Sequence, residues 1–257
     1  MRDQGLQEAI RVSGGVSELA RRIGLSQPSV SNWDRIPADR VLTVESATGV
    51  SRAILRPDLF AANPAGDANE IDVARAQEYA LLSALLIRAP DAGLLARLAE
   101  LRGDATPLGL AHAALSQAAS ATPVEKVERE YFNLFIGLGR GELLPYGSYY
   151  LTGFLHERPL ARLRGDLAAL GIERAEGQFE PEDHAAILCE IMAGLASGRF
   201  GAKPGSDQML FEKHLSPWVG RFFADLERAE AADFYRRVGT LGRVFVEIES
   251  EAFALPS

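Results

Sequence analysis

Glu130-Tyr-Phe-Asn-Leu-Phe135 and Pro145-Tyr-Gly-Ser-Tyr-Tyr-Leu-Thr-Gly153 are the two stretches around which the rest of this 257-residue chain is organised. The first stretch ends a run whose apolar side chains recur with helical spacing, which predicts one buried helix face over residues 124–136. Glycines between the stretches let the backbone turn, and the second stretch brings three tyrosines. Tyrosine combines an apolar ring with a hydroxyl group, which suits a groove that receives a peptide, although the same rings would equally serve as core.

Together the two stretches form a first motif, Glu-Tyr-x-x-Leu-Phe followed by Pro-aromatic-Gly-Ser-x-Tyr. A second motif, Glu180-Pro-Glu-Asp-His184, lies further along the chain. In this order the two motifs resemble the signature of the TorD/DmsD family, which are cytoplasmic chaperones for bacterial molybdenum redox enzymes. Two motifs in the right order are more specific than either alone. Residues 208–218 resemble a third family feature, a helix ending in His-Leu-x-Pro-Trp, and the resemblance covers about residues 71–250.

The resemblance implies where a peptide binds. In the TorD/DmsD family the second motif lines the groove that holds the partner's leader peptide, so Asp183 and His184 would meet a basic or polar part of that peptide. Residues of the first motif would shape its apolar bed. The peptide-binding residues implied in this way are Tyr131, Leu134, Phe135, Pro145, Ser148, Tyr150, Glu180, Asp183 and His184.

The second motif also has a purely structural explanation. Pro181 suits the first turn of a helix that begins near Glu180, and Glu182 and Asp183 there would complement the positive end of the helix dipole. Capping alone would therefore account for both acids. It does not require His184, because a cation is disfavoured at a helix N-terminus, whereas a neutral imidazole could donate to one partner and accept from another.

Residues 16–33, Val-Ser-Glu-Leu-Ala-Arg-Arg-Ile-Gly-Leu-Ser-Gln-Pro-Ser-Val-Ser-Asn-Trp, predict a helix-turn-helix. Gly24 allows the tight turn, Pro28 is tolerated in the first turn of the second helix, and Val30 and Trp33 would face inward. The outward face of the second helix is then free to enter a DNA groove, where Gln and Asn can pair with adenine. The candidate DNA-binding residues are Gln27, Pro28, Ser31 and Asn32.

This segment resembles the small Cro-like repressor domains of the YdaS type, in which the second helix reads DNA. Residues 1–60 hold eight arginines and seven acids, a net charge of only +1, whereas phosphate neutralisation normally supplies most of the affinity for DNA. A docking or dimerisation module therefore stays open as an alternative. The remainder holds 19 basic and 28 acidic residues, a net charge of −9, so any basic peptide partner is expected on residues 71–257.

The chain divides by composition into a helix-turn-helix domain over residues 1–60, a linker of small residues over 61–70, and a chaperone domain over 71–257. Apolar residues that recur with helical spacing, bounded by proline and glycine residues that end helices, predict helices over 74–87, 107–121, 124–136, 159–170 and 231–254. No run alternates as a strand would. The expected fold class is all-α in both domains.

Several classes of protein are disfavoured. Without a run of about eighteen apolar residues or an apolar signal segment, we expect a cytoplasmic protein that does not insert into membranes. The four histidines lie far apart, so no metal site is expected, and the glycines at 137–141 follow no strand as a nucleotide loop would. The single cysteine, Cys189, is expected to pack as a small apolar residue. We expect neither a cofactor nor catalysis.

The resemblance to the TorD/DmsD family implies a cytoplasmic chaperone. It would bind the leader peptide, a twin-arginine export signal, or the apo form of a molybdenum-cofactor oxidoreductase and assist its maturation before export. The expected partners are the catalytic subunit of such an enzyme and its leader. The alternative is a transcriptional regulator that binds operator DNA through residues 16–33 and uses the chaperone domain as a sensor of the oxidoreductase or its leader. Which oxidoreductase is the client stays open.

Overall fold

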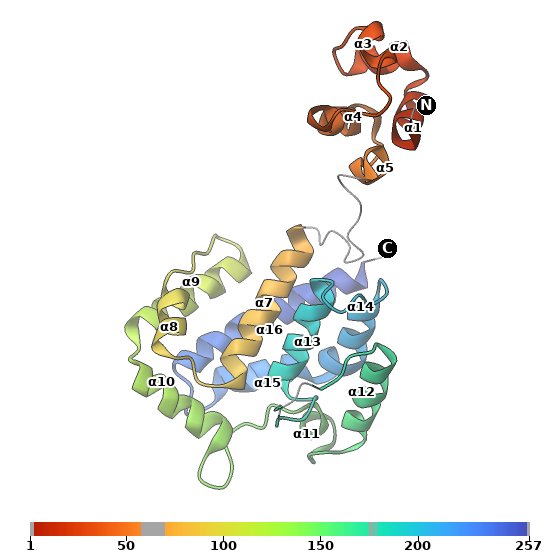
Figure 1. The fold of residues 1–257 in the computed structure, drawn as a ribbon. Coiled ribbons are helices and arrows are strands. Elements are labelled where there is room, and N and C mark those ends of the chain that lie inside the picture. The colour runs from red at the N-terminus through yellow and green to blue at the C-terminus, as the bar shows by residue number, and fades with distance from the viewer. Residues whose placement is uncertain (1–2, 58–69, 175–176, 178, 256–257) are drawn as a thin grey trace. The chain divides into compact units, whose positions relative to one another are not determined.

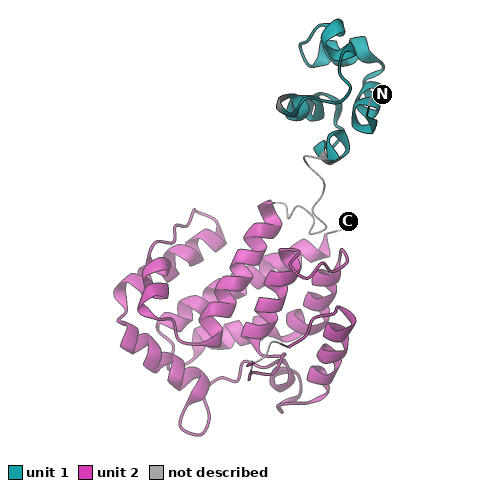
Figure 2. Ribbon diagram, in the orientation of Figure 1, with its two compact units in different colours: residues 1–67 teal, residues 68–257 magenta. Residues whose placement is uncertain are grey.

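The chain folds into two compact units, residues 1–67 and residues 68–257 (Figure 2). The computed structural model describes residues 3–57, 70–174, 177 and 179–255. Within these ranges the backbone forms helices, turns and loops but no strand, which confirms the predicted all-α fold. The predicted linker, residues 61–70, lies outside the described residues except for Glu70, which is the first residue of a helix.

The first unit is built from short helices around a small apolar core. Asp3 and Ser26 cap two of these helices, because their side chains accept the backbone N–H groups of Leu6 and Ser29. Gly24 has a φ of 70°, a left-handed conformation that favours glycine, and it makes the turn of the predicted helix-turn-helix. The elements are α1 (Gln4–Ser13), α2 (Val16–Arg22), α3 (Gln27–Ser31), a 3₁₀ turn (Ala38–Arg40), α4 (Val41–Thr48) and α5 (Arg52–Leu55).

The second unit holds the remaining described helices. They are α7 (Glu70–Ile87), α8 (Ala92–Ala99), α9 (Pro107–Ala121), α10 (Val124–Tyr131), α11 (Gly147–Thr152), α12 (Arg158–Ala169), α13 (Ala185–Ala196), α14 (Ser206–Leu210), α15 (Ser216–Arg228) and α16 (Phe234–Ala254). Local chemistry fixes several boundaries. Asp91 caps α8 by accepting the Leu94 N–H, and Thr106 caps α9 just before Pro107, which occupies the first turn.

Helices α7 and α13 form the central pair of this unit and share its most extensive helix–helix contact. Helix α16 packs against α15 and α9, and α8 packs on α9. In Figure 1, α8, α9 and α10 lie on one side of the central pair, whereas α11, α12 and α14 lie on the other. The first motif starts at the end of α10 and continues through α11, and the second motif directly precedes α13.

Large aromatic side chains fill the core of the second unit. Burying such a side chain completely contributes roughly 1.5–3 kcal/mol. Cys189 is also buried in α13, and burial raises the pKa of its thiol to about 12, so it packs as an unreactive apolar residue, as predicted. The largest fully buried aromatic residues are Tyr79, Phe211, Phe222, Phe223, Phe234 and Tyr235.

A buried charged cluster ties α7 to α14 and α16. The Arg75 guanidinium donates to Glu249 at 2.8 Å and to Asp207 at 2.9 Å, and the Tyr79 hydroxyl donates to Glu249 at 2.9 Å. Glu249 is only 1% exposed, so its charge depends on these donors. The cluster fixes the register of three helices that are far apart in the sequence.

The helix predicted over residues 124–136 is interrupted. Helix α10 ends at Tyr131, and Phe132–Ile136 form a π-helical turn instead. The following loop folds back on this turn, because the Glu142 and Leu143 N–H groups donate to the carbonyls of Asn133 and Leu134. Only a glycine allows this approach, since a Cβ at Gly141 would lie 2.6 Å from the Leu134 carbonyl oxygen.

Two other predicted helix boundaries are wrong. The helix of the second motif begins at Ala185 rather than near Glu180, because the Ala185 N–H is used by the carbonyl of Pro145 in the first motif. The predicted helix ending at Trp218 instead passes through a π-helical turn, Phe211–Leu215, into α15, where Trp218 is buried. The first error arises from a contact with a segment that is distant in the sequence.

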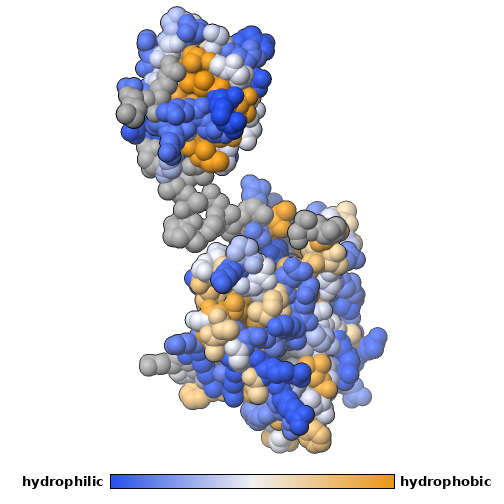
Figure 3. Space-filling model, turned by 90° about the vertical axis from the view of Figure 1, so that its right-hand side faces the viewer, coloured by the Kyte–Doolittle hydropathy of each residue, from blue (hydrophilic) through white to orange (hydrophobic). Residues whose placement is uncertain are grey.

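Apolar side chains also reach the surface of each unit, where they gather in separate patches among hydrophilic residues on the face shown in Figure 3. None of the helices in the described ranges combines the length and apolar composition that a membrane span requires.

Candidate functional site

The two motifs lie side by side. Tyr146 and His184 form an isolated antiparallel bridge, in which the Gly147 N–H donates to the Asp183 carbonyl at 2.9 Å and the Ala185 N–H to the Pro145 carbonyl at 2.8 Å. The Asp183 side chain adds a third link, since its Oδ2 accepts the Ser148 N–H at 2.7 Å. That bond caps the first turn of α11, so the second motif positions the start of the helix that the first motif encodes.

His184 is the N-cap of α13. Its Nδ1 accepts the backbone N–H of Ala186 at 3.0 Å, which places the proton of the neutral ring on Nε2. The side chain is buried, and burial lowers the pKa of the imidazole from 6.5 to about 4 although Glu180 and Asp183 act to raise it. A neutral imidazole is the form that can cap a helix N-terminus, so the ring acts as an acceptor there.

Glu180 joins the same cluster through a tyrosine. The Tyr146 hydroxyl donates to Glu180 Oε2 at 2.7 Å, and the Tyr146 ring meets the His184 ring edge-to-face at 5.0 Å. Burial raises the pKa of Tyr146, and the Glu180 carboxylate raises it further. Burial likewise raises the pKa of Tyr131 to about 12, with a smaller contribution from Glu180. Both phenols therefore remain protonated donors at neutral pH.

Asp183 and Ser148 leave polar atoms without partners. Asp183 is 3% exposed and Ser148 is fully buried, yet Asp183 Oδ1 and Ser148 Oγ make no hydrogen bond to any described residue. Buried polar atoms are normally satisfied, so two such atoms on neighbouring residues indicate a place for a ligand or solvent. A cavity of about 210 Å³ lies at this point. It is called here the motif cavity. The residues that line it are Tyr146, Ser148, Leu155, His156, Phe179, Pro181 and Asp183.

Two of the residues that line the motif cavity, Leu155 and Phe179, are exposed apolar residues, and Phe154 precedes Leu155 in the chain. Phe179 is 91% exposed, Phe154 is 69% exposed and Leu155 is 40% exposed. His156 in the same loop has a φ of 60°, a left-handed conformation that non-glycine residues rarely adopt. Sequence reasoning missed all four residues. Only Phe179 carried a signal, its position directly before the second motif.

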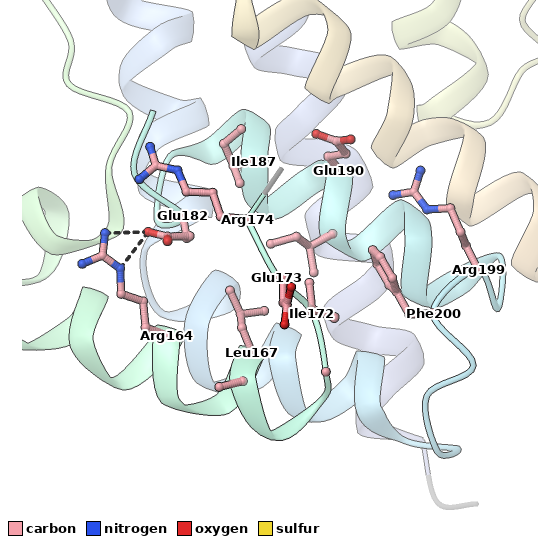
Figure 4. Close-up of a pocket in the computed structure, with 13 residues that line it drawn as sticks. Arg164, Leu167, Ile172, Glu173, Arg174, Glu182, Ile187, Glu190, Arg199 and Phe200 are labelled. Atoms are coloured by element: carbon pink, nitrogen blue, oxygen red, sulfur yellow. Dashed lines mark hydrogen bonds and ion pairs between the residues drawn. The ribbon is translucent and has the colours of Figure 1, made fainter. Parts of the chain in front are cut away.

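A second cavity, of about 420 Å³, lies on the other side of the second motif (Figure 4). Pro181 and Asp183 line the motif cavity, whereas Glu182 between them lines this larger one. The Glu182 carboxylate pairs with Arg164 of α12 at 2.8 Å, and Arg174 donates to the Glu180 carbonyl at 3.0 Å. The second motif therefore forms a wall between the two cavities.

The structure places the other implied peptide-binding residues mainly in packing positions. Leu134 and Pro145 are buried. Tyr131 and Phe135 are half-buried and stack on Tyr235, with ring centroids 5.8 and 5.5 Å away. Tyr150 packs on α15 and donates its hydroxyl to an aspartate there at 3.1 Å. Of the nine implied residues, those that belong to the hydrogen-bonded junction of the two motifs are Pro145, Ser148, Glu180, Asp183 and His184.

Glu130, the first residue of the first motif, has a structural role that the sequence did not reveal. It is 5% exposed, and its carboxylate accepts the backbone N–H groups of Asp233, Phe234 and Tyr235 at 2.7, 3.1 and 2.6 Å. These N–H groups begin α16 and would otherwise lack partners. Glu130 therefore caps a helix about a hundred residues away in the chain.

In the first unit, α3 presents a polar, uncharged surface. Gln27, Pro28 and Asn32 are exposed, Ser31 is half-buried, and the Gln27 side-chain amide donates to Ser31 Oγ at 2.7 Å. Val30 of the same helix is fully buried, as predicted. The neighbouring arginines of α2 are not available as free cations, because both pair with one glutamate of that helix.

No group of histidine, cysteine and acidic residues in the described ranges has the geometry of a metal site.

The fold and the site define a helical domain in which two sequence motifs build one cavity, preceded by a helix-turn-helix domain. Residues 101–224 match the family model described as nitrate reductase delta subunit, and residues 6–64 match that described as bacterial toxin YdaS. The second unit is thus similar to the TorD/DmsD family of redox-enzyme maturation chaperones, and the first unit is similar to helix-turn-helix domains of the YdaS type.

Individual relatives agree with this assignment. The chain is 27% identical over 127 residues to the chaperone protein TorD of Vibrio cholerae serotype O1, covering 46% of this chain and 58% of that protein. It is 29% identical over 119 residues to a Haemophilus influenzae protein assigned as the Tat proofreading chaperone DmsD, covering 46% of this chain and 57% of that protein. The chain thus matches less than two thirds of the length of either relative.

Among solved structures, a protein of Archaeoglobus fulgidus assigned as a redox enzyme maturation protein aligns with 67% of this chain and 93% of its own. The TM-score is 0.45 and the sequence identity is 20%.

Proposed function

We propose that the protein is a cytoplasmic maturation chaperone that binds the leader peptide or apo form of a molybdenum-cofactor oxidoreductase before export. The observation that carries this proposal is the motif cavity, where the buried Asp183 carboxylate has an unused oxygen and exposed apolar side chains stand around the entrance. A twin-arginine leader joins basic residues to an apolar stretch. The chemistry of the cavity is complementary to such a segment.

Affinity and register would come from different parts of this site. Burial of apolar leader side chains against exposed residues such as Phe179 would supply most of the binding free energy. The acidic groups, Asp183 and Glu180, would mainly fix where the basic residues lie. By holding the leader, the protein would keep the client from being exported before its cofactor is inserted. No step of this role requires a cofactor or catalysis by the chaperone.

Isothermal titration calorimetry with a synthetic twin-arginine leader peptide tests the proposal. We expect a Kd of about 1 μM or tighter, weakened by Asp183→Ala and by His184→Ala. Glu182→Ala is the matched control, because Glu182 is the neighbouring acid of the same motif but lines the other cavity. Equal binding by wild type and by both site variants would reject the site assignment.

The helix-turn-helix supports a second candidate function, a transcriptional regulator that senses the oxidoreductase or its leader. The observation that supports it is the polar surface of α3 and of its C-cap, where Gln27 and Asn32 are exposed and could reach base edges. Binding of the oxidoreductase or its leader to the second unit could then control gene expression through the first unit. An electrophoretic mobility-shift assay at low salt, with DNA from the operon that encodes this protein, tests the hypothesis. Specific DNA binding that is lost in Asn32→Ala would support the regulator hypothesis. If no DNA fragment binds specifically, the hypothesis is rejected.

A further inference from the structure

We propose that the cavity of about 420 Å³ shown in Figure 4, called here the α12–α13 cavity, binds one small amphiphilic carboxylate. Such a ligand consists of an alkyl chain that ends in a carboxylate group. The chain would lie on the apolar floor of the cavity, and the carboxylate would bind the guanidinium group of Arg199. This inference goes beyond the proposed function and does not depend on whether a leader peptide binds at the motif cavity.

The floor of the α12–α13 cavity is apolar. Leu167, Ile187 and Ile191 line it although they are only 4%, 8% and 7% exposed, and Ile172 and Phe200 add two half-buried side chains. The volume falls within the roughly 300–1,000 Å³ of small-molecule sites, in which a mostly apolar lining is combined with a few polar groups that fix the orientation of the ligand. Because four of these five side chains are aliphatic, an alkyl chain is the body that fits.

Arg199 is held at one end of the cavity by the way in which α13 ends (Figure 4). Its backbone N–H donates to the Gly194 carbonyl at 2.9 Å, and its guanidinium lies over the Phe200 ring, 4.9 Å from the ring centroid. Both side chains approach Gly194 closely, because a Cβ there would lie 2.2 Å from a ring carbon of Phe200 and 2.9 Å from Arg199 Nη2. A glycine at this position therefore fixes the guanidinium on the ring that lines the cavity.

The donors of Arg199 are free to bind an anion. Among the residues that the structure describes, no carboxylate or carbonyl accepts a hydrogen bond from its guanidinium. The other two arginines that line the cavity are engaged, since Arg164 pairs with Glu182 at 2.8 Å and Arg174 donates to the Glu180 carbonyl at 3.0 Å. A guanidinium presents its N–H groups in a planar fork that matches the two oxygens of a carboxylate. Arg199 is therefore the group at which the head of the ligand would bind.

Two further acids of the cavity do not reverse the sign of the ligand. Glu173 and Glu190 line the rim, but both are exposed, and neither pairs with another of the described residues. Their side chains are solvated and can turn toward water when a ligand binds. The Arg199 guanidinium is already fixed on the lining, so less ordering is needed when it binds a ligand. The charge that is held in place favours an anion over a cation.

The first experiment compares three ligands that share one alkyl chain: octanoate, 1-octanol and octylammonium. Each is titrated into the full-length protein by isothermal titration calorimetry at concentrations below micelle formation. We expect octanoate to bind at least about tenfold more tightly than 1-octanol, because only octanoate makes charged hydrogen bonds to Arg199, and octylammonium to bind most weakly. Equal affinities of octanoate and octylammonium, or no binding of octanoate, would overturn the inference.

The second experiment fills the cavity. Ala168 and Ala169 are adjacent exposed residues of α12, and of the two only Ala168 lines the cavity. The indole of Ala168→Trp would occupy the space of the alkyl chain, so we expect octanoate binding to weaken by at least about tenfold. Ala169→Trp is the matched control and should bind octanoate as the wild type does. Equal octanoate affinity in the two variants would exclude this cavity as the site.

The third experiment removes the charge of Arg199. Arg199→Gln is expected to lower the affinity for octanoate to that for 1-octanol and to leave the affinity for 1-octanol unchanged. Arg162→Gln is the control, because Arg162 is an exposed arginine of α12 that does not line this cavity. Unchanged octanoate binding in Arg199→Gln would refute the assignment of the carboxylate. Failure of the leader peptide to bind the same preparations would reject the proposed function and leave the octanoate results to decide this inference.

Discussion

Lowering the pH from 7 to 5 is expected to destabilise the second unit, because the unfolded chain protonates His184 in this range whereas the folded state keeps the buried imidazole neutral. His184 caps α13 through Nδ1 and must be neutral to accept the Ala186 N–H. The matched perturbation is His184→Asn. Asparagine is a favoured N-cap whose side-chain oxygen can accept the same N–H, but it does not titrate.

The magnitude follows from the two pKa values of His184. Burial lowers the folded-state pKa to about 4, whereas the unfolded chain has the ordinary value of 6.5. The stabilisation from the neutral folded form is fully present above pH 6.5 and is lost as the pH falls toward 4, because the unfolded state takes up the proton first. Between pH 7 and pH 5 this linkage removes about 2 kcal/mol from the free energy of unfolding.

Urea denaturation at the two pH values measures this loss. Trp218 is buried in the second unit, so tryptophan fluorescence in a Trp33→Phe background reports the unfolding of that unit alone. Wild type and His184→Asn share every other titrating group, including His112, so the difference between their pH dependences isolates His184. We expect the wild type to lose about 2 kcal/mol more than the variant between pH 7 and pH 5.

One result would refute this reasoning. If wild type and His184→Asn lose the same free energy of unfolding between pH 7 and pH 5, His184 is not held neutral by burial in the folded protein. The absolute stability of the variant at pH 7 does not enter this comparison, because the readout is the change with pH in each protein.

Three further perturbations test other parts of the fold. Glu130→Ala removes three hydrogen bonds to the first turn of α16 and is expected to cost about 3 kcal/mol in urea denaturation, whereas the exposed neighbour Glu128→Ala should change little. Arg75→Met leaves the buried Glu249 without its cation and should cost about 3–5 kcal/mol, most of it regained when Glu249→Leu is added. Gly5→Ala would place a Cβ 2.1 Å from a backbone carbonyl of α5, so the first unit should lose about 1–3 kcal/mol, seen as a lower midpoint of its thermal unfolding by Trp33 fluorescence.

Much of the fold could be read from short windows of sequence. Thr106 and Pro107 mark the start of α9, and Asp91 marks that of α8, because a cap and its helix lie within three residues of each other. Gly24 marks the turn of the helix-turn-helix for the same local reason. Apolar spacing then identified the buried helix faces. These features depend only on neighbours along the chain.

The site was only partly predictable. The motifs identified Asp183 and His184, but not that His184 caps α13 or that Asp183 caps α11 while leaving one oxygen unused. The long-range cap made by Glu130 gave no signal in the sequence, and the position of Phe179 before the second motif did not reveal that its side chain is exposed.

The sequence by itself determined the all-α class, the two-part organisation and the identity of the two motifs, since propensity, capping and apolar periodicity act over a few residues. The tertiary structure alone decided which of those residues are buried, which carboxylates find partners, and where a cavity remains between segments far apart in the chain. Hydrogen bonding and burial at such places depend on which other segment arrives there, and no local window of sequence contains that information.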